Sequence, residues 1–184
     1  MPKIIIGLTG QIASGKGVSK KYLEKEYGAS SHRFSTVMRD ILKRLYLPLE
    51  RNNLQNLSLS IRKAFGGDIF AKVIAQDVSS DSNNIVVIDG VRRFDDITSL
   101  KNLTGFYLIA IKANPEIRYQ RVISRNENAG DNQKTWEQFL EEEKGEAEME
   151  IPKVMATAKF HLDNNGTLDE LYLQIDQIIK SLSL

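Results

Sequence analysis

Residues 10–16 read Gly-Gln-Ile-Ala-Ser-Gly-Lys, and this stretch is the strongest indication of the fold class. It follows the apolar run Ile4-Ile5-Ile6-Gly7-Leu8 and precedes a segment of helix-forming residues. A strand, a glycine-containing loop and a helix in this order aim successive N–H groups at one small volume, at the positive end of the helix. The G-x-x-x-x-G-K pattern in this context predicts a phosphate-binding loop rather than an ordinary glycine-rich turn.

The residue after the lysine departs from the usual loop pattern. A Ser or Thr hydroxyl normally touches Mg²⁺ there, whereas this chain has Gly17. The departure favours a site in which Mg²⁺ is held mostly through water and substrate phosphates. Ser19 is interpreted as a residue of the helix surface, with a role near the metal as the alternative. The residues expected to hold the nucleotide phosphates are Gly10, Ala13, Ser14, Gly15, Lys16, Gly17 and Val18.

Composition limits the classes of partner. With 184 residues, of which 41% are hydrophobic, the chain is expected to form one compact domain. Its 25 basic and 24 acidic residues give a net charge of +1, which argues against nucleic acid or an anionic membrane as a partner. Cysteine is absent, so disulfides and thiolate metal sites are excluded. With no apolar run of membrane-spanning length and no secretory signal pattern, we expect a cytoplasmic monomer or homodimer.

Short apolar runs alternate with longer helical patterns, which is typical of a parallel sheet covered by helices. The unbroken β-branched run at 85–88 predicts a central strand that is buried on both faces. Strands are expected at 3–8, 30–34, 84–89, 105–112 and 159–163. Helices are expected at 15–27, 36–46, 54–64, 68–79, 95–101, 115–127, 135–150 and 168–181. An all-helical segment at about 35–80 and a polar loop at about 126–134 look like insertions into this core.

Asp89 ends one predicted strand, at the edge where open α/β sheets bind ligands. We interpret it as an acid that orients Mg²⁺ through water, with a turn or cap residue as the alternative. Arg92 and Arg93 follow at once. One of them, with Arg92 favoured, is expected to grip a substrate phosphate while the other pairs with a surface acid.

Two further groups of residues have the spacing of an anion site. Ser35 or Thr36 is expected to cap a helix, and Arg39 lies one turn beyond Ser35, so hydroxyl and guanidinium could cradle a monophosphate. The plainer reading is a cap and a surface arginine. The second group, Arg118, Arg121 and Arg125, lies along one side of a helix and could contact phosphates, with a solvated basic face as the alternative.

The remaining polar and aromatic residues are expected to be structural. Arg62 and Asp68 are weaker candidates that could equally form structural ion pairs. Residues 135–138 form a capping box, which makes Trp136 a packing anchor. The run 141–143, three glutamates, is expected on the solvated surface, and His32 and His161 have no nucleophile or acid at catalytic spacing.

The loop at 10–17, Ser35 with Arg39, Asp-Gly-Val-Arg-Arg at 89–93 and the three helical arginines together resemble the nucleoside monophosphate kinase-like group of P-loop kinases. Asp-Gly-Val-Arg and Thr-Trp-Glu-Gln-Phe-Leu at 135–140 look like the small adenylate-kinase-related proteins of archaeal type and the deoxynucleotide-kinase-like proteins. Many of these proteins are described only as predicted nucleotide or dephospho-coenzyme A kinases. The resemblance covers nearly the whole chain.

The resemblance implies a three-layer α/β/α P-loop fold with a five-stranded parallel sheet. It implies one domain over 1–184, with its core at about 1–34, 81–125 and 151–184, a helical acceptor-binding insertion at 35–80 and a lid at 126–150. It further implies that Arg39 and Arg92 bind the acceptor phosphate and that Arg121 and Arg125 come from the lid. Adenylate kinases carry Asp-Gly-x-Pro-Arg, which would shift the phosphate-binding arginine to Arg93.

The expected function is transfer of the γ-phosphoryl group of ATP to a nucleoside or deoxynucleoside monophosphate, with ATP and Mg²⁺ as cofactors. A phosphate acceptor is already ionised, so catalysis would need positioning and positive charge rather than a general base. Lys16, Arg92, Arg121 and Arg125 would supply that charge. One alternative is dephospho-coenzyme A kinase, whose hydroxyl acceptor favours a carboxylate base, where this chain has Ser35-Thr36. Another is a nucleotide-binding regulatory protein with slow ATPase activity.

Overall fold

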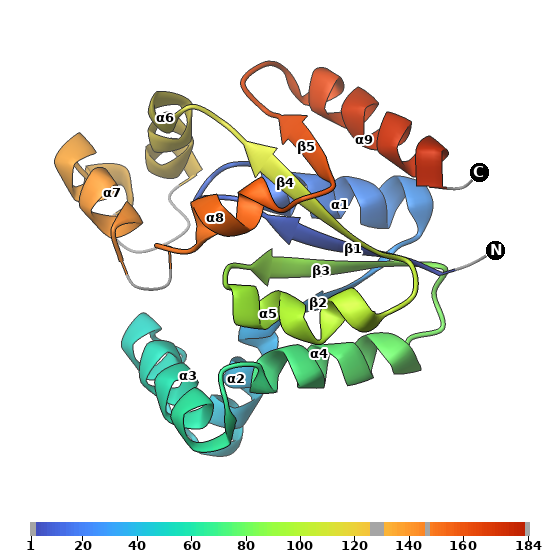
Figure 1. Ribbon diagram of the computed structural model, residues 1–184. Coiled ribbons are helices and arrows are strands. Elements are labelled where there is room, and N and C mark those ends of the chain that lie inside the picture. Colours follow the sequence, from blue (N-terminus) through green and yellow to red (C-terminus); the bar gives the residue numbers. More distant parts are fainter. Residues whose placement is uncertain (1–2, 126–130, 146–147, 183–184) are drawn as a thin grey trace.

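The computed structural model describes residues 3–125, 131–145 and 148–182, and its centre is a five-stranded parallel sheet (Figure 1). The strand order is β2-β3-β1-β4-β5, and every pair of neighbours is parallel. The expected strands are confirmed with small shifts at their ends. Their bounds are β1 (Ile4–Thr9), β2 (Ser30–Arg33), β3 (Ile85–Val91), β4 (Phe106–Lys112) and β5 (Phe160–Asp163).

Two hydrophobic clusters fill the spaces above and below the sheet. The alternation of side chains along β1 sends Ile6 into one cluster and Ile5 into the other, and both are buried. The first cluster packs against α1 (Lys16–Tyr27) and α9 (Leu168–Leu182). The second packs against α2 (Phe34–Arg44), α4 (Ile69–Ser80), α5 (Phe94–Thr98) and α8 (Ile151–Ala156). The result is the predicted three-layer α/β/α architecture.

Three helices lie beyond the sheet on the side to which the strand arrowheads point: α3 (Arg51–Phe65), α6 (Pro115–Arg125) and α7 (Trp136–Glu143) (Figure 1). Two short 3₁₀ helices complete the set, η1 (Leu100–Asn102) and η2 (Asp131–Gln133). Residues 126–130 of the predicted polar loop and lid lie outside the described residues. Within the described ranges, no helix combines the length and apolar character needed to cross a bilayer.

Some helix boundaries differ from the sequence prediction. The helix expected at 36–46 begins at Phe34, whose ring is buried in the second cluster, so Ser35 and Thr36 lie inside its first turn. The prediction that one of them caps the helix is therefore wrong. The helix expected at 135–150 ends at Glu143, close to Gly145, and the unpredicted α8 follows. The helix expected at 95–101 is divided into α5 and η1.

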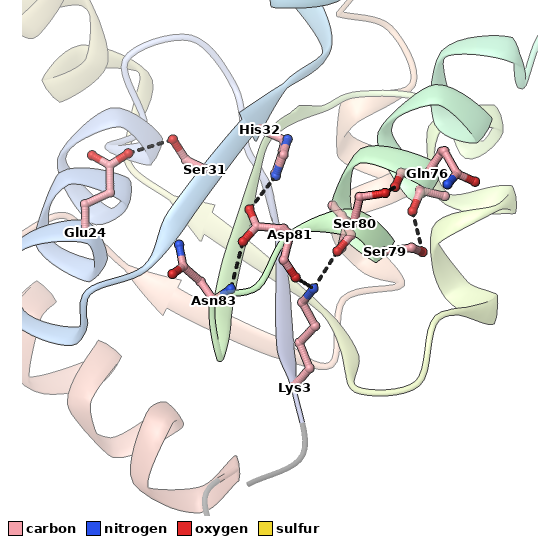
Figure 2. A network of polar contacts seen from close by, with 11 residues as sticks. Lys3, Glu24, Ser31, His32, Gln76, Ser79, Ser80, Asp81 and Asn83 are labelled. Carbon is pink, nitrogen blue, oxygen red and sulfur yellow. Dashed lines mark hydrogen bonds and ion pairs between the residues drawn. The ribbon is translucent and has the colours of Figure 1, made fainter.

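A network of polar contacts ties the turn between α4 and β3 to the sheet (Figure 2). Lys3 Nζ donates to the carbonyls of Val78 and Asp81, while the carboxylate of Asp81 accepts from the N–H of Asn83 and contacts His32 Nε2 at 2.8 Å. Burial pushes the pKa of Asp81 upward, but hydrogen bonds that include those from Asn83 and His32 outweigh it and lower the pKa to about 2. His32 thus has the structural role that was expected of it.

Candidate functional site

The carboxyl ends of three strands meet beside the glycine-rich loop. Arg33, the last residue of β2, lies opposite Asp89 of β3, and Asp89 lies opposite Leu8 of β1. In the sheet, β3 and β2 lie on one side of β1, and β4 and β5 lie on the other side of β1. The chain therefore changes direction at β1. Such a change of direction is where open α/β sheets form ligand crevices. The fold therefore brings the loop and Asp89 to the same edge.

Two glycines of the loop occupy positions that no other residue fits. A Cβ on Gly10 would lie 2.5 Å from Ser14 Oγ and 2.6 Å from the carbonyl of Ile111. Gly15 has φ of +115°, and a Cβ there would lie 2.1 Å from Asn164 Nδ2. Both positions need glycine because the backbone passes too close to its neighbours for a side chain.

Lys16 lies folded over the loop. Its Nζ donates to the carbonyls of Gly10 at 2.6 Å and Gln11 at 2.9 Å. Ser14 and Ser19 are buried, and within the described part of the chain neither hydroxyl has a hydrogen-bond partner. The expectation that Ser19 lies on the helix surface is wrong, because its side chain turns into the protein. In contrast, a Cβ on Gly17 would meet no described atom within 4 Å apart from its chain neighbours and the backbone of its own helix.

Asn164 supports the loop from the end of β5, and sequence analysis missed it. Its side chain is 2% exposed, and Nδ2 donates to the Ser14 carbonyl at 2.7 Å. Its backbone N–H donates to Lys112 and its carbonyl accepts from Arg121 Nη2 at 2.9 Å. The available signal was an Asn-Asn-Gly turn directly after a strand of the same sheet, but that pattern was interpreted only as a turn.

Arg118 is buried rather than part of a basic face. It is 1% exposed, its Nε donates to the Ala113 carbonyl at 3.0 Å, and its two terminal nitrogens contact the carboxylate of Glu143. Glu143 Oε1 also accepts from Gln11 Nε2 at 3.1 Å, so α7 is linked to the glycine-rich loop. The prediction that Glu143 is solvated is wrong because the buried guanidinium requires an anionic partner.

Arg121 differs from Arg118 in having one terminal nitrogen without a partner among the described residues. One terminal nitrogen donates to Asn164, and the other is buried with no hydrogen-bond partner among the described residues. Burial lowers the pKa of its guanidinium below the ordinary value. A shallow hollow of about 360 Å³ lies at this helix face, lined by Glu116, Ile117, Gln120, Arg121 and Ser124. The Arg125 side chain lies outside the part of the chain that the structure describes.

A second polar group lies at the start of α2. The Ser35 hydroxyl is buried and Arg39 is half-buried, one helical turn away. Neither side chain has a hydrogen bond or ion pair to any other described residue. Just before them, Arg33 Nε lies 3.4 Å from Asp89 Oδ2. A buried hydroxyl without a partner is uncommon in folded proteins and calls for an explanation.

The Asp-Gly-Val-Arg-Arg segment is held by a buried acid. Asp96, which is 3% exposed, accepts hydrogen bonds from the N–H groups of Arg92 and Arg93 at 3.0 and 3.1 Å. Its other oxygen pairs with Arg62 of α3 at 2.8 Å, so Arg62 forms a structural ion pair. The Arg92 side chain pairs with Glu148 at 2.7 Å.

Other residues behave as the sequence indicated. Thr135 and Gln138 form the expected capping box at the start of α7. Trp136 packs against Tyr119 and Phe139, with ring centroids 5.4 and 5.7 Å apart. Its role as a packing anchor is confirmed.

Comparison with known proteins identifies a family for the chain that forms this site. A family model described as an AAA domain matches residues 9–139. A UPF0200 protein from Sulfurisphaera tokodaii is 30% identical over 178 residues, covering 97% of each chain. A UPF0200 protein from Hyperthermus butylicus is 27% identical over 181 residues, covering 98% of this chain and 96% of the relative.

Solved structures show the same fold over nearly the whole chain. TT1252 from Thermus thermophilus superposes with a TM-score of 0.67 at 22% identity, covering 99% of both chains. A shikimate kinase from Bacteroides thetaiotaomicron gives a TM-score of 0.63 at 12% identity, covering 98% of this chain and 99% of the other. The protein therefore has a P-loop kinase-like fold.

Proposed function

We propose that this chain, which belongs to the AAA domain family, is an ATP-dependent phosphotransferase. The donor is the γ-phosphoryl group of ATP, and the acceptor is the phosphate of a nucleoside or deoxynucleoside monophosphate. The observation that carries this proposal is the pair formed by Ser35 and Arg39. Their hydroxyl and guanidinium have no partner among the described residues, and they follow β2 at the same sheet edge as the glycine-rich loop.

The donor phosphates would bind in the loop at 10–18. The backbone there leaves a cradle that a Cβ on Gly10 or Gly15 would fill, which fits a bound phosphate. Lys16 would exchange its two carbonyl partners for phosphate oxygens, and the loop amides from Ala13 to Val18 would supply further donors. The hollow beside Arg121 would accept part of the nucleoside.

Mg²⁺ fits this site only as an ion carried mainly by water and phosphates. Within residues 3–125, 131–145 and 148–182, no cluster of three or more acidic or histidine side chains could hold a metal by itself. Asp89 is a single buried carboxylate near the C-terminal end of β3, which suits contact through water. When bound, Mg²⁺ would neutralise charge on the phosphates; Asp89 would orient its water shell.

The acceptor phosphate would lie against Ser35, Arg39 and Arg92, with Arg93 nearby. The Ser35 hydroxyl would gain the partner that it lacks, and the Arg39 guanidinium would gain a counter-ion. In this proposal the helical segment 35–80 binds the acceptor, and the described parts of 126–150, chiefly α7, belong to a lid.

The chemistry would follow from position and charge. A phosphate oxygen of the acceptor is ionised near neutral pH and attacks in line without a general base. The negative charge on the transferring group would be balanced by Lys16, Arg92, Arg121 and Arg125. This electrostatic stabilisation is stronger once water is excluded from the site.

A hydroxyl acceptor, as in a dephospho-coenzyme A kinase, is the second candidate. The observation in its favour is Asp89, a buried carboxylate at the crevice that could act as a base. The shikimate kinases of the same fold share too little sequence with this chain to assign a substrate. Asp89→Asn distinguishes the two: loss of a general base costs about 100- to 10,000-fold in turnover, whereas a weakened water-mediated contact costs less.

The test is a screen of all ribo- and deoxyribonucleoside monophosphates and dephospho-coenzyme A for ATP-dependent ADP formation, with Lys16→Ala as the control. Acceptor-dependent ADP release that Lys16→Ala abolishes supports the proposal. Slow ADP release that no acceptor accelerates supports a nucleotide-binding regulatory protein instead. If calorimetry with Mg²⁺ detects no ATP binding to the folded protein, the kinase proposal fails.

A further inference from the structure

The carboxylate of Glu148 forms an ion pair with Arg92, the arginine that would bind the acceptor phosphate in the proposed function. Glu148 Oε1 lies 2.7 Å from Arg92 Nη1. The Glu148 side chain is only 14% exposed, whereas that of Arg92 is 44% exposed. The Arg92 guanidinium is therefore accessible to solvent, but its Nη1 group is already paired with the Glu148 carboxylate.

Glu148 belongs to a segment that touches both proposed phosphate sites. We call residues 143–150 the acidic connector, of which 143–145 and 148–150 are described. At one end Glu143 accepts from Gln11 of the glycine-rich loop. At the other end Glu150 Oε2 accepts from the N–H of Phe94 at 3.1 Å, next to the Arg92–Glu148 pair. Carboxylates from the two described parts of the connector thus contact the donor loop and the acceptor arginine.

The connector is anchored in the core just beyond Glu148. Ile151 and Val154 of α8 are buried, at 1% and 0% exposure, and the N–H of Ile151 donates to the Glu148 carbonyl. The N–H of Glu148 donates to the Gly145 carbonyl at 2.8 Å. The carboxylate is therefore held beside Arg92 by backbone contacts on both sides, which a freely moving surface side chain would not have.

We propose that Glu148 is a specificity-determining residue that competes with the acceptor's anionic group for Arg92. The inference rests on the proposed function, because it concerns the same acceptor site. A phosphate with nearly two negative charges is a stronger partner for a guanidinium than one carboxylate, so it displaces Glu148. Ligands with a single weak anionic group do not, because Glu148 both occupies Arg92 and repels them.

Displacement also has a cost. Once Arg92 binds phosphate, Glu148 is a poorly exposed carboxylate without its counter-ion, which offsets part of the gain from phosphate binding.

The alternative is that Glu148 and Arg92 only fasten the connector to the protein. The two readings differ in a measurable way. A fastening contact lowers the melting temperature when it is removed and leaves anion affinity unchanged. A competing carboxylate raises anion affinity when its charge is removed, because Arg92 becomes available.

The experiment is a double-mutant cycle on inorganic phosphate binding, followed by ³¹P NMR titration. Every protein carries Lys16→Ala, which weakens phosphate binding at the donor loop. The set comprises this background alone, Glu148→Gln, Arg92→Gln and the double variant, with a thermal melt of each. Glu141→Gln is the matched control, because Glu141 is a 74% exposed glutamate whose carboxylate pairs, among the described residues, with Lys144 alone.

We expect Glu148→Gln to tighten phosphate binding by up to about fivefold, the range for a partly exposed ion pair, and Glu141→Gln to change nothing. Arg92→Gln should weaken binding and remove the gain from Glu148→Gln in the double variant. Unchanged phosphate affinity in Glu148→Gln would overturn the inference, as would a gain that persists without Arg92. The measurement involves no turnover, so tighter binding in Glu148→Gln would stand even if no phosphoryl transfer were found.

Discussion

Replacement of Gly15 by alanine should disrupt the phosphate-binding loop through two separate costs. At φ of +115° the alanine would be strained, which costs about 1–3 kcal/mol. Its Cβ would also lie 2.1 Å from Asn164 Nδ2, and this short, 2% exposed side chain has no room to turn away. Loss of the buried hydrogen bond from Asn164 to the Ser14 carbonyl costs about 1–3 kcal/mol more.

The middle of these ranges gives a loss of about 4 kcal/mol, and for a chain of this size Tm should fall by about 12 °C. Thermal unfolding followed by circular dichroism measures the change, and calorimetry with ATP reports the loop itself. Gly17→Ala is the matched control: the new Cβ meets nothing within 4 Å, so stability should stay the same or rise slightly.

Equal melting temperatures for the two glycine variants would refute the reasoning. So would a Gly15→Ala protein that binds ATP as well as the unmodified chain, since the loop could then adopt its shape without the support of Asn164. A fall in stability without loss of ATP binding would mean that the clash is absorbed outside the loop.

Three further predictions concern other sites. Lys16→Ala should lower acceptor-dependent ADP formation by at least about 100-fold while the circular dichroism spectrum stays native; full activity would remove the loop from the proposed mechanism. Glu143→Gln leaves the charge of buried Arg118 unpaired and should cost about 3 kcal/mol in urea unfolding, against less than about 0.5 for Glu141→Gln; equal losses would contradict this. Because the pKa of Asp81 is lowered from 3.8 to about 2, its contribution to stability is complete above pH 4 and is lost as pH falls toward 2. Asp81→Asn should therefore lose less stability than the unmodified chain between pH 5 and pH 2.5, and parallel losses would show that Asp81 contributes nothing there.

The layer architecture was predictable because its signals are local. The run at 85–88 is apolar at every position, so a strand formed by it must be buried on both faces. The loop at 10–16 follows β1 directly in the sequence. Helix ends were less predictable, since they depend on contacts far along the chain. At α2 the sequence pointed to a cap at Ser35 or Thr36, but the helix begins at Phe34, two residues before the expected start, with the Phe34 ring buried against the sheet.

The supporting residues of the candidate site could not be read from the sequence. Asn164 contacts Ser14 across 150 positions, and Glu143 contacts Gln11 across 132. No local pattern encodes such pairs. Arg118 shared the helical spacing of Arg121, yet spacing indicates only a common side of a helix and not whether that side faces solvent or protein.

The position of Asn164 has a consequence for how the chain matures. The glycine-rich loop precedes the rest of the sheet in the chain, but its supporting amide comes from the turn after β5, an edge strand that pairs with β4. A nascent chain or truncated fragment ending before this turn would carry the complete loop motif without the shape needed to grip a nucleotide. The shape of the loop therefore depends on a segment 150 positions further along the chain.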